Sequence, residues 1–289
     1  TACEGKSNIV FVDKVTAIAP TLVADKSQLS LKCNGSSYGK ITVTATGGKQ
    51  DEAYSFLLKM QDGSAATTSS INPNPQGVFE GLKAGVYKVE VSQLNGGCDT
   101  KSVENITITE ETAYKVKYDL EDVKCNGDKN GKITITMLPG GEQHRDGRQR
   151  KLTYAISPRL DRFLDKPGGV IDSLAPGKYF VIVQDENGCR PNEIFEKDNT
   201  TATGLDIIEF TIGEPEPLSV TVNPEATEHE SCIDAKDGKT RLRVFGGTPV
   251  STDPITHDKV YQLIIDSNAP IAYHTKDSGD LLEGLSAGE

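Results

Sequence analysis

The six cysteines of this chain are the residues with the clearest chemistry. They lie beside turn-forming sequences such as Asn34-Gly35 and Asn187-Gly188. Cysteines on turns form structural disulfides in oxidising compartments, whereas the alternative, a buried free thiol, is typical of core positions. We therefore expect structural disulfides. The four cysteines that we assign to them are Cys33, Cys98, Cys125 and Cys189.

One loop has side chains that could bind calcium. Asn126, Asp128 and Asn130 have the spacing of the first ligands of an EF-hand loop, which binds Ca²⁺ through carboxylate and amide oxygens. The bidentate glutamate of that loop is missing, because Met137 stands at its position. Asn130-Gly131 also suits a two-residue hairpin turn, which needs positive φ. We expect the turn and keep the metal site as a weak alternative.

The sequence predicts no catalytic residue and no cofactor. Ser37 lies in a G-x-S-x-G pattern, but that hydrolase motif requires a strand before it and a helix after it. Here a strand-type run, residues 40–46, follows the motif. The four histidines lack ligand spacing, and we expect them in solvated loops.

These residues recur because the chain repeats itself. Lys32-Cys33-Asn34-Gly35 returns as Lys124-Cys125-Asn126-Gly127, and a weaker copy contains Cys232. The cysteines are 92 and 107 residues apart (125 − 33 and 232 − 125), which is the length of a small domain rather than of a solenoid unit. We assign 1–20 to the tail of a preceding repeat, 21–111 to the first repeat, 112–213 to the second and 214–289 to a truncated third.

The elements that position these residues are expected to be strands. Runs of Ile, Val, Thr and Tyr alternate with Gly, Asn, Asp, Ser and Pro clusters, which indicates an all-β fold. In residues 40–46, Ile41, Val43 and Ala45 should face the core, and Thr42 and Thr44 the solvent. The equivalent core residues of the second repeat are Ile133, Ile135 and Met137. The pattern predicts tandem immunoglobulin-like β-sandwich modules arranged end to end.

Two local features refine this expectation. Tyr87 and Tyr179 each follow a Leu-x-x-Gly sequence, and we interpret them as corner tyrosines whose hydroxyl bonds nearby backbone. Residues 157–164 have an N-cap, a first-turn proline and apolar residues at helical spacing, which predicts one short helix.

Charge and hydropathy exclude some partners. The net charge of −11 argues against nucleic acid, which is bound by basic patches. No apolar run approaches the roughly 20 residues of a membrane span. We therefore expect neither nucleic-acid binding nor a membrane span in this segment.

The cysteines allow two pairings. Pairing within each repeat gives Cys33–Cys98 and Cys125–Cys189. The alternative joins Cys33 of the first repeat to Cys189 of the second. In an immunoglobulin-like sandwich the start of the second strand and the end of the sixth lie at opposite ends, so a cysteine at the bottom of one repeat could reach a cysteine at the top of the next. We prefer pairing within repeats, since each copy then carries its own bond.

The motif set resembles the SprB repeat. It comprises Cys-Asn-Gly, Gly-Lys-Ile-Thr-Val-Thr, Gly-Gly, a Tyr, Leu-x-x-Gly-x-Tyr and, in the second copy, Asp185-Glu186-Asn187-Gly188-Cys189. The third copy departs from it, because Asn-Gly is lost after Cys232. The family is found in giant surface adhesins of gliding Bacteroidetes.

This resemblance implies a location and partners. It implies export by the type IX secretion machinery, an outer-membrane-associated cell-surface location and a role in adhesion or gliding. The partner would be an external surface, a polysaccharide or another cell-surface protein. Asp172-Ser173-Leu174 resembles a Bacteroidetes O-glycosylation site, which makes Ser173 a candidate for modification. The alternative function is a stalk or carbohydrate-binding appendage of a large secreted hydrolase.

Overall fold

The computed structural model describes residues 15–93, 99–196, 207–252, 254, 257–265, 269–275 and 279–286. These residues form strands joined by turns and three short 3₁₀ helices, and they contain no α-helix. No helix among them is long and apolar enough to cross a membrane. The expected all-β class is therefore confirmed.

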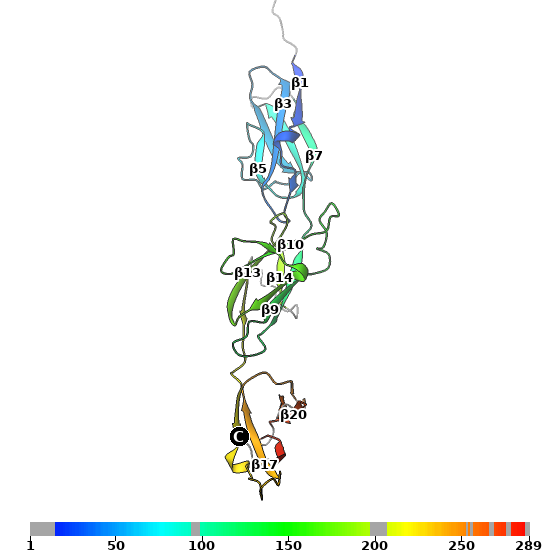
Figure 1. Cartoon of the computed structure of the whole chain (residues 1–289). Coiled ribbons are helices and arrows are strands. Elements are labelled where there is room, and N and C mark those ends of the chain that lie inside the picture. The colour runs from blue at the N-terminus through cyan, green and yellow to red at the C-terminus, as the bar shows by residue number, and fades with distance from the viewer. Residues whose placement is uncertain are drawn as a thin grey trace, which may run out of the picture. The chain divides into compact units, whose positions relative to one another are not determined.

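The first repeat folds into two sheets, with strand orders β1-β3-β5 and β2-β7-β6-β4 (Figure 1). The strands are β1 (Thr16–Leu22), β2 (Ser30–Leu31), β3 (Gly39–Gly48), β4 (Tyr54–Met60), β5 (Val78–Leu82), β6 (Gly85–Gln93) and β7 (Lys101–Glu110). Buried side chains of both sheets form one hydrophobic cluster. The two sheets thus pack face to face as a sandwich. The predicted boundary after residue 20 falls inside β1, which pairs with β3.

Strand β3 shows how well alternation predicts burial. Ile41 and Val43 are fully buried and Thr44 is exposed, as expected. Thr42 is the exception, because it is only 6% exposed. Its hydroxyl donates a 3.0 Å hydrogen bond to the carbonyl of Lys26 in the 3₁₀ helix η1 (Ala24–Lys26), which covers it.

The second repeat has the same plan with orders β12-β9-β8-β14 and β11-β10-β13-β15. Its elements are β8 (Lys115–Glu121), β9 (Gly131–Met137), β10 (Leu152–Ile156), β11 (Leu164–Asp165), η2 (Pro167–Gly169), β12 (Val170–Leu174), β13 (Gly177–Asp185), β14 (Glu193–Phe195) and β15 (Ile208–Ile212). Ile133 and Ile135 of β9 are buried like Ile41 and Val43. The expected equivalence is confirmed for these four residues, whereas Ala45 and Met137 are only half-buried.

Two local predictions for the second repeat are wrong. Residues 157–163 form turns and irregular backbone rather than a helix, and Leu164 begins β11. The Ser157 hydroxyl accepts from the amide of Phe180 instead of capping a helix. Asn130-Gly131 is not a positive-φ hairpin turn. Gly131 begins β9, and a Cβ there would lie 2.5 Å from Ile212 Cγ2, so close packing explains the glycine.

The third repeat has sheets of order β16-β17-β21 and β18-β19-β20. Its elements are β16 (Ser219–Val222), η3 (Pro224–Ala226), β17 (Gly238–Phe245), β18 (Ser251–Thr252), β19 (Lys259–Leu263), β20 (Ile271–His274) and β21 (Leu281–Leu285). Strands β16, β17 and β21 pair as β1, β3 and β5 do. The described residues of this repeat contain no strand in the place of β6 or β13.

The chain divides into two compact units. The first contains Thr1–Lys115, Leu138–Lys151 and Gln184–Asn192. The second contains Val116–Met137, Leu152–Val183 and Glu193–Glu289. The first unit thus contains the first repeat and two loops of the second, one between β9 and β10 and one after β13. The site described next lies entirely within this unit.

Candidate functional site: a disulfide with its polar surroundings

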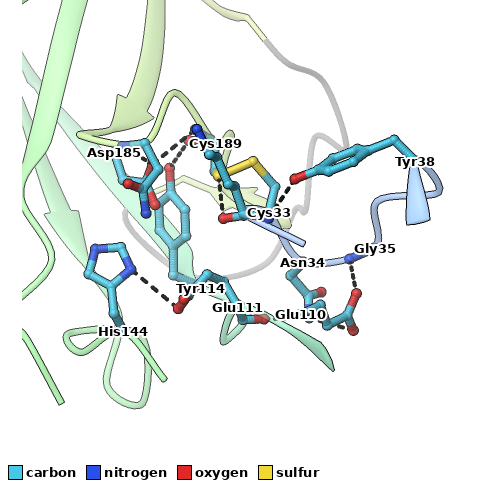
Figure 2. The surroundings of a disulfide bond; sticks show 12 residues. Cys33, Asn34, Gly35, Tyr38, Glu110, Glu111, Tyr114, His144, Asp185 and Cys189 are labelled. Atoms are coloured by element: carbon cyan, nitrogen blue, oxygen red, sulfur yellow. Dashed lines mark hydrogen bonds and ion pairs between the residues drawn. A yellow bond between two sulfur atoms is a disulfide. The ribbon is translucent and has the colours of Figure 1, made fainter. Parts of the chain in front are cut away.

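A disulfide joins Cys33 to Cys189 in the first compact unit (Figure 2). The two Cα atoms are 5.4 Å apart, although 156 residues separate them in sequence. Cys33 lies in the turn after β2, and Cys189 lies in the turn after β13. The bond therefore ties the first repeat to a loop of the second.

The preferred pairing within repeats is wrong, and strand register explains why. Strand β2 pairs in parallel with the end of β7, with Leu31 opposite Glu110. Strand β7 has ten residues and spans about 30 Å to its start at Lys101. The three residues from Cys98 to Lys101 reach at most about 10 Å, whereas bridged Cα atoms lie within about 7 Å. Cys33 therefore cannot bond Cys98.

The remaining cysteines are either free or outside the described residues. Cys125, which we expected to pair with Cys189, is free and exposed. Cys232 is free and exposed as well. Cys3 and Cys98 lie outside the described residues.

The Cys189 side of the bond is a turn built by Asp185. One carboxylate oxygen, Oδ1, accepts 2.9 Å hydrogen bonds from the amides of Asn187 and Cys189. The amide of Asp185 donates to the carbonyl of Cys189, and Gly188 has a φ of 81°. The Tyr114 hydroxyl also donates to that carbonyl, at 2.7 Å. The Asp-x-Asn-Gly-Cys sequence is thus a self-closed turn that holds its cysteine in place.

The Cys33 side is a turn that grips the end of β7. Asn34 Nδ2 donates to Glu110 Oε1 at 3.0 Å and to the carbonyl of Glu111 at 3.1 Å. The amide of Gly35 donates to Glu110 Oε2 at 2.7 Å. Asn34 Oδ1 accepts from Asn192 Nδ2 at 2.9 Å. One asparagine side chain therefore connects the turn, the end of the first repeat and the loop after Cys189.

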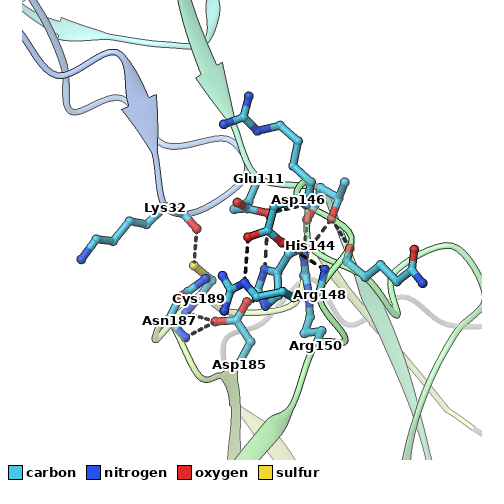
Figure 3. Close-up of polar contacts among 12 residues, drawn as sticks. Lys32, Glu111, His144, Asp146, Arg148, Arg150, Asp185, Asn187 and Cys189 are labelled. Carbon is cyan, nitrogen blue, oxygen red and sulfur yellow. Dashed lines mark hydrogen bonds and ion pairs between the residues drawn. The ribbon is translucent and has the colours of Figure 1, made fainter.

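A buried ion pair lies beside the Cys189 turn (Figure 3). Arg150 Nε is 3.8 Å from Asp185 Oδ2, and both side chains are 1% exposed. The guanidinium packs on the Tyr114 ring, 4.4 Å from its centroid, and donates to the carbonyl and hydroxyl of Thr112. Burial raises the pKa of Tyr114. Removing either charge would leave the other desolvated, so the pair is coupled to the turn geometry.

A fully buried histidine connects the two repeats in the same region. His144 Nε2 lies 2.9 Å from Glu186 Oε1, and Nδ1 lies 3.3 Å from Glu111 Oε2. The side chain of His144 is 0% exposed, so the expectation of a solvated histidine is wrong here. Burial by itself would raise the pKa of Glu186, but hydrogen bonds from the Lys151 amide and from His144 outweigh it and lower that pKa.

The same residues are the candidates for a metal. His144, Asp185 and Glu186 each offer a ligand atom, and these atoms lie within 4.8 Å of one another. Arg150 already supplies the positive charge beside Asp185, and Glu186 is engaged by His144 and Lys151. A divalent cation would be repelled by the guanidinium. The donor set suits an ion-pair network better than a metal centre.

The calcium-like loop is closed by its own hydrogen bonds. Asn130 Oδ1 accepts from the amide of Lys124, and Asn130 Nδ2 donates to Asp128 Oδ2, each at 3.0 Å. Asn126 Nδ2 donates to the carbonyl of Pro215 at 3.0 Å. These side chains thus have structural partners, which supports a turn.

The remaining candidate residues lie away from the disulfide. The hydroxyls of Tyr87 and Tyr179 donate 2.9 Å bonds to the carbonyls of Lys83 and Ala175, four residues earlier, which is the bond that a corner tyrosine makes. Ser173 is exposed on β12 with a φ of 60°. Ser37 lies exposed in the loop before β3.

The sequence-based search missed Tyr114, His144, Arg150 and Glu111. None of them belongs to a repeated motif. For His144 and Arg150 the one signal was the polar, basic insertion at 142–151, which is present only in the second repeat. Glu111 and Tyr114 lie outside that insertion and had no such signal.

The fold and this site define the chain as a tandem repeat protein of immunoglobulin-like β-sandwich modules with a disulfide between repeats. Residues 28–60 match the model of the SprB repeat. This match confirms the resemblance inferred from the motifs. No curated protein sequence matches the chain.

Solved structures give weaker likenesses. The three N-terminal domains of the bacteriophage RB49 Highly Immunogenic Outer Capsid protein (Hoc) are 13% identical, with 94% of this chain and 86% of that chain covered and a TM-score of 0.33. The Clostridium thermocellum CbhA fibronectin(III)-like modules are 13% identical, with 68% and 95% covered and a TM-score of 0.28. Domains 4–9 of the surface layer protein SbsC are 11% identical, with 96% and 46% covered and a TM-score of 0.25. At these TM-scores we draw no argument from them.

Proposed function

We propose that this chain is a repeat segment of a large secreted adhesin of the cell surface, where it provides reach and surface attachment without catalysis. The proposal includes the division into three repeats, with the predicted 21–111 extended to contain all of β1, followed by 112–213 and 214–289. It also includes export by the type IX machinery and outer-membrane association. Its partner would be an external surface, a polysaccharide or another cell-surface protein.

The observation that carries the proposal is the disulfide between repeats. The first repeat and the loops of the second are joined by the peptide chain at residues 110–114 and by the Cys33–Cys189 bond. Two covalent connections resist separation of the repeats under tension better than one. Such a joint suits a protein that is pulled between a cell and a surface, and a disulfide suits an oxidising exterior.

The SprB match supports the same proposal from the sequence side. The matched residues 28–60 include Cys33, Asn34 and Gly35, which form the turn that grips Glu110. The conspicuous part of the repeat motif therefore builds the joint. Motif residues that connect one repeat to the next favour a spacer function over an active site.

The test uses antibody fragments raised against the chain on intact cells of the producing organism. We expect labelling without permeabilisation and reduced attachment to glass or polysaccharide when the fragments are bound. Labelling that requires permeabilisation would contradict the surface location. Unchanged attachment together with impaired polysaccharide hydrolysis would instead favour the alternative, an appendage of a secreted hydrolase.

A further inference from the structure

Cys125 occupies in the second repeat the place that Cys33 occupies in the first. The sequence Lys124-Cys125-Asn126-Gly127 is identical to Lys32-Cys33-Asn34-Gly35. Cys125 is nevertheless free and exposed, whereas Cys33 is bonded to Cys189. The same four-residue sequence therefore carries a disulfide-bonded cysteine in the first repeat and a free cysteine in the second.

Two of the hydrogen bonds that hold the Cys33 turn recur around Cys125. The Asn126 side chain donates to the carbonyl of Pro215, as the Asn34 side chain donates to that of Glu111. The amide of Gly127 donates to Glu214 Oε2 at 3.0 Å, as that of Gly35 donates to Glu110. The second turn is thus built and held like the first, before any sulfur is bonded to it.

The partner of Cys33 shows what such a turn accepts. Cys189 ends the turn that Asp185 closes through its own hydrogen bonds, and Asn192, three residues later, donates to Asn34 Oδ1. The Asp-x-Asn-Gly-Cys turn that the structure describes, 185–189, is already bonded to Cys33. A second Asp-x-Asn-Gly-Cys turn with an asparagine three residues after its cysteine, as Asn192 follows Cys189, would find at Cys125 the sulfur and, in Asn126, the acceptor for that asparagine.

We propose that Cys125 is a disulfide site for the cysteine of another Asp-x-Asn-Gly-Cys turn. The Cys125 thiolate attacks the turn cysteine of a mixed disulfide between that cysteine and a small-molecule thiol. The new Sγ–Sγ bond forms as the mixed S–S bond breaks, and the small thiol leaves as a thiolate that takes up a proton. The number of disulfides is unchanged, so this exchange needs no further oxidant. The turn comes from another part of the same polypeptide or from a neighbouring chain.

Cys232 provides the matched control within the same chain. It is also free and exposed, but the residues after it are Ile233 and Asp234 in place of Asn-Gly. Its turn therefore lacks the asparagine acceptor. A reagent that recognises only an accessible thiol reacts at both cysteines, whereas one that recognises the turn prefers Cys125.

The first experiment uses the full chain and a synthetic peptide of residues 184–192 whose cysteine is activated as the 5-thio-2-nitrobenzoate disulfide. Mass spectrometry of digests gives the rates at which the peptide becomes attached to Cys125 and to Cys232. The ratio of the rates at which 5,5′-dithiobis(2-nitrobenzoate) reacts with the same two thiols gives their intrinsic relative reactivity. We expect the peptide to raise the preference for Cys125 by about tenfold, as one gained hydrogen bond would. Asn126→Ala, or a peptide with Asn192→Ala, should abolish that gain. A peptide ratio equal to the intrinsic ratio overturns the proposal.

The second experiment reads the partner directly. The protein is isolated from its natural source with N-ethylmaleimide present, and the Cys125 peptide is mapped without reduction. Linkage to an Asn-Gly-Cys turn supports the proposal, and the mass of the intact protein under non-reducing conditions separates a same-chain partner from a neighbouring chain. An N-ethylmaleimide adduct at Cys125, or a bond to any cysteine outside such a turn, overturns it.

Discussion

Replacing Arg150 by methionine should destabilise the first compact unit strongly. Methionine keeps much of the length of the side chain but removes the charge opposite Asp185. Asp185 is 1% exposed, so water cannot take over the role of the guanidinium. The carboxylate would be left buried and uncompensated beside the turn that holds Cys189.

The burial of the pair sets the magnitude. Breaking a buried ion pair by removing one partner costs about 3–5 kcal/mol, and loss of the contact with Tyr114 adds about 1 kcal/mol. The matched control is Arg148→Met. Arg148 pairs with Asp146 at 2.7 Å, but these side chains are 62% and 52% exposed. An exposed pair of this kind contributes about 0–1 kcal/mol.

Calorimetry of the full chain provides the assay, and hydrogen exchange of residues 184–192 locates the effect. We expect Arg150→Met to lower the transition of the first unit by about 10 °C or more and Arg148→Met to leave it nearly unchanged. The double variant Arg150→Met/Asp185→Asn should recover at least half of the loss. It removes both charges, and the asparagine oxygen can still accept from the amides of Asn187 and Cys189.

Two results would refute this reasoning. Equal effects of Arg150→Met and Arg148→Met would mean that the pair is solvated in solution. A double variant no more stable than Arg150→Met would mean that the loss comes from packing and not from an unpaired charge. In either case the ion pair would not be the support of the Cys189 turn.

Three further predictions concern charge, backbone and extension. The pKa of Glu186 in the folded chain lies below its ordinary value of 4.5, so the stability that Glu186 contributes is present above pH 4.5 and is lost as the pH falls through the folded pKa. Glu186→Gln should therefore flatten the acid side of a plot of melting temperature against pH. An unchanged slope would contradict this. Ser173→Gly should stabilise the chain by up to about 1 kcal/mol in denaturant titrations, because a φ of 60° strains a residue with a Cβ. Gly81→Ser should destabilise it, because Gly81 has a φ of 74° and a Cβ there would also lie 2.6 Å from Ser69 Oγ. A loss of stability in Ser173→Gly would exclude strain at Ser173. Repeats arranged end to end should give a radius of gyration of about 30 Å by small-angle scattering, and a value near the 19 Å of a globular chain of this length would reject the spacer proposal.

The strands could be predicted from the sequence because the signal is local. Ile41, Val43, Ile133 and Ile135 alternate with polar residues, and a period of two assigns them to one face without knowledge of the fold. Thr42 departed from the pattern because η1, a separate element, covers it. Such a contact leaves no mark in the alternation.

The sequence indicated that Cys33 and Cys189 form disulfides, but it did not indicate that they bond to each other. The turn sequences identified Cys33 and Cys189 as disulfide cysteines. The partner depended on β2 lying parallel to the end of β7, and nothing in the sequence specifies the register of a two-residue strand. Equal numbers of cysteines in each copy favoured the wrong alternative.

The polar network around the disulfide could not be predicted because its members are far apart in sequence. His144 contacts Glu186 across 42 residues, and Tyr114 contacts Cys189 across 75. The motifs repeat, but these residues occur in one copy. A search based on repetition therefore excluded the residues that support the joint.

Non-reducing peptide mapping tests the central claim, that one repeat is bonded to the next. The chain is digested with free thiols blocked, and cysteine-linked peptides are identified before and after reduction. For this chain produced alone, without the partner turn proposed for Cys125, the account predicts a linked pair containing Cys33 and Cys189, with Cys125 and Cys232 recovered as blocked thiols. Linked pairs containing Cys33 with Cys98 and Cys125 with Cys189 would contradict it, because each repeat would then be closed on itself and no covalent joint would exist.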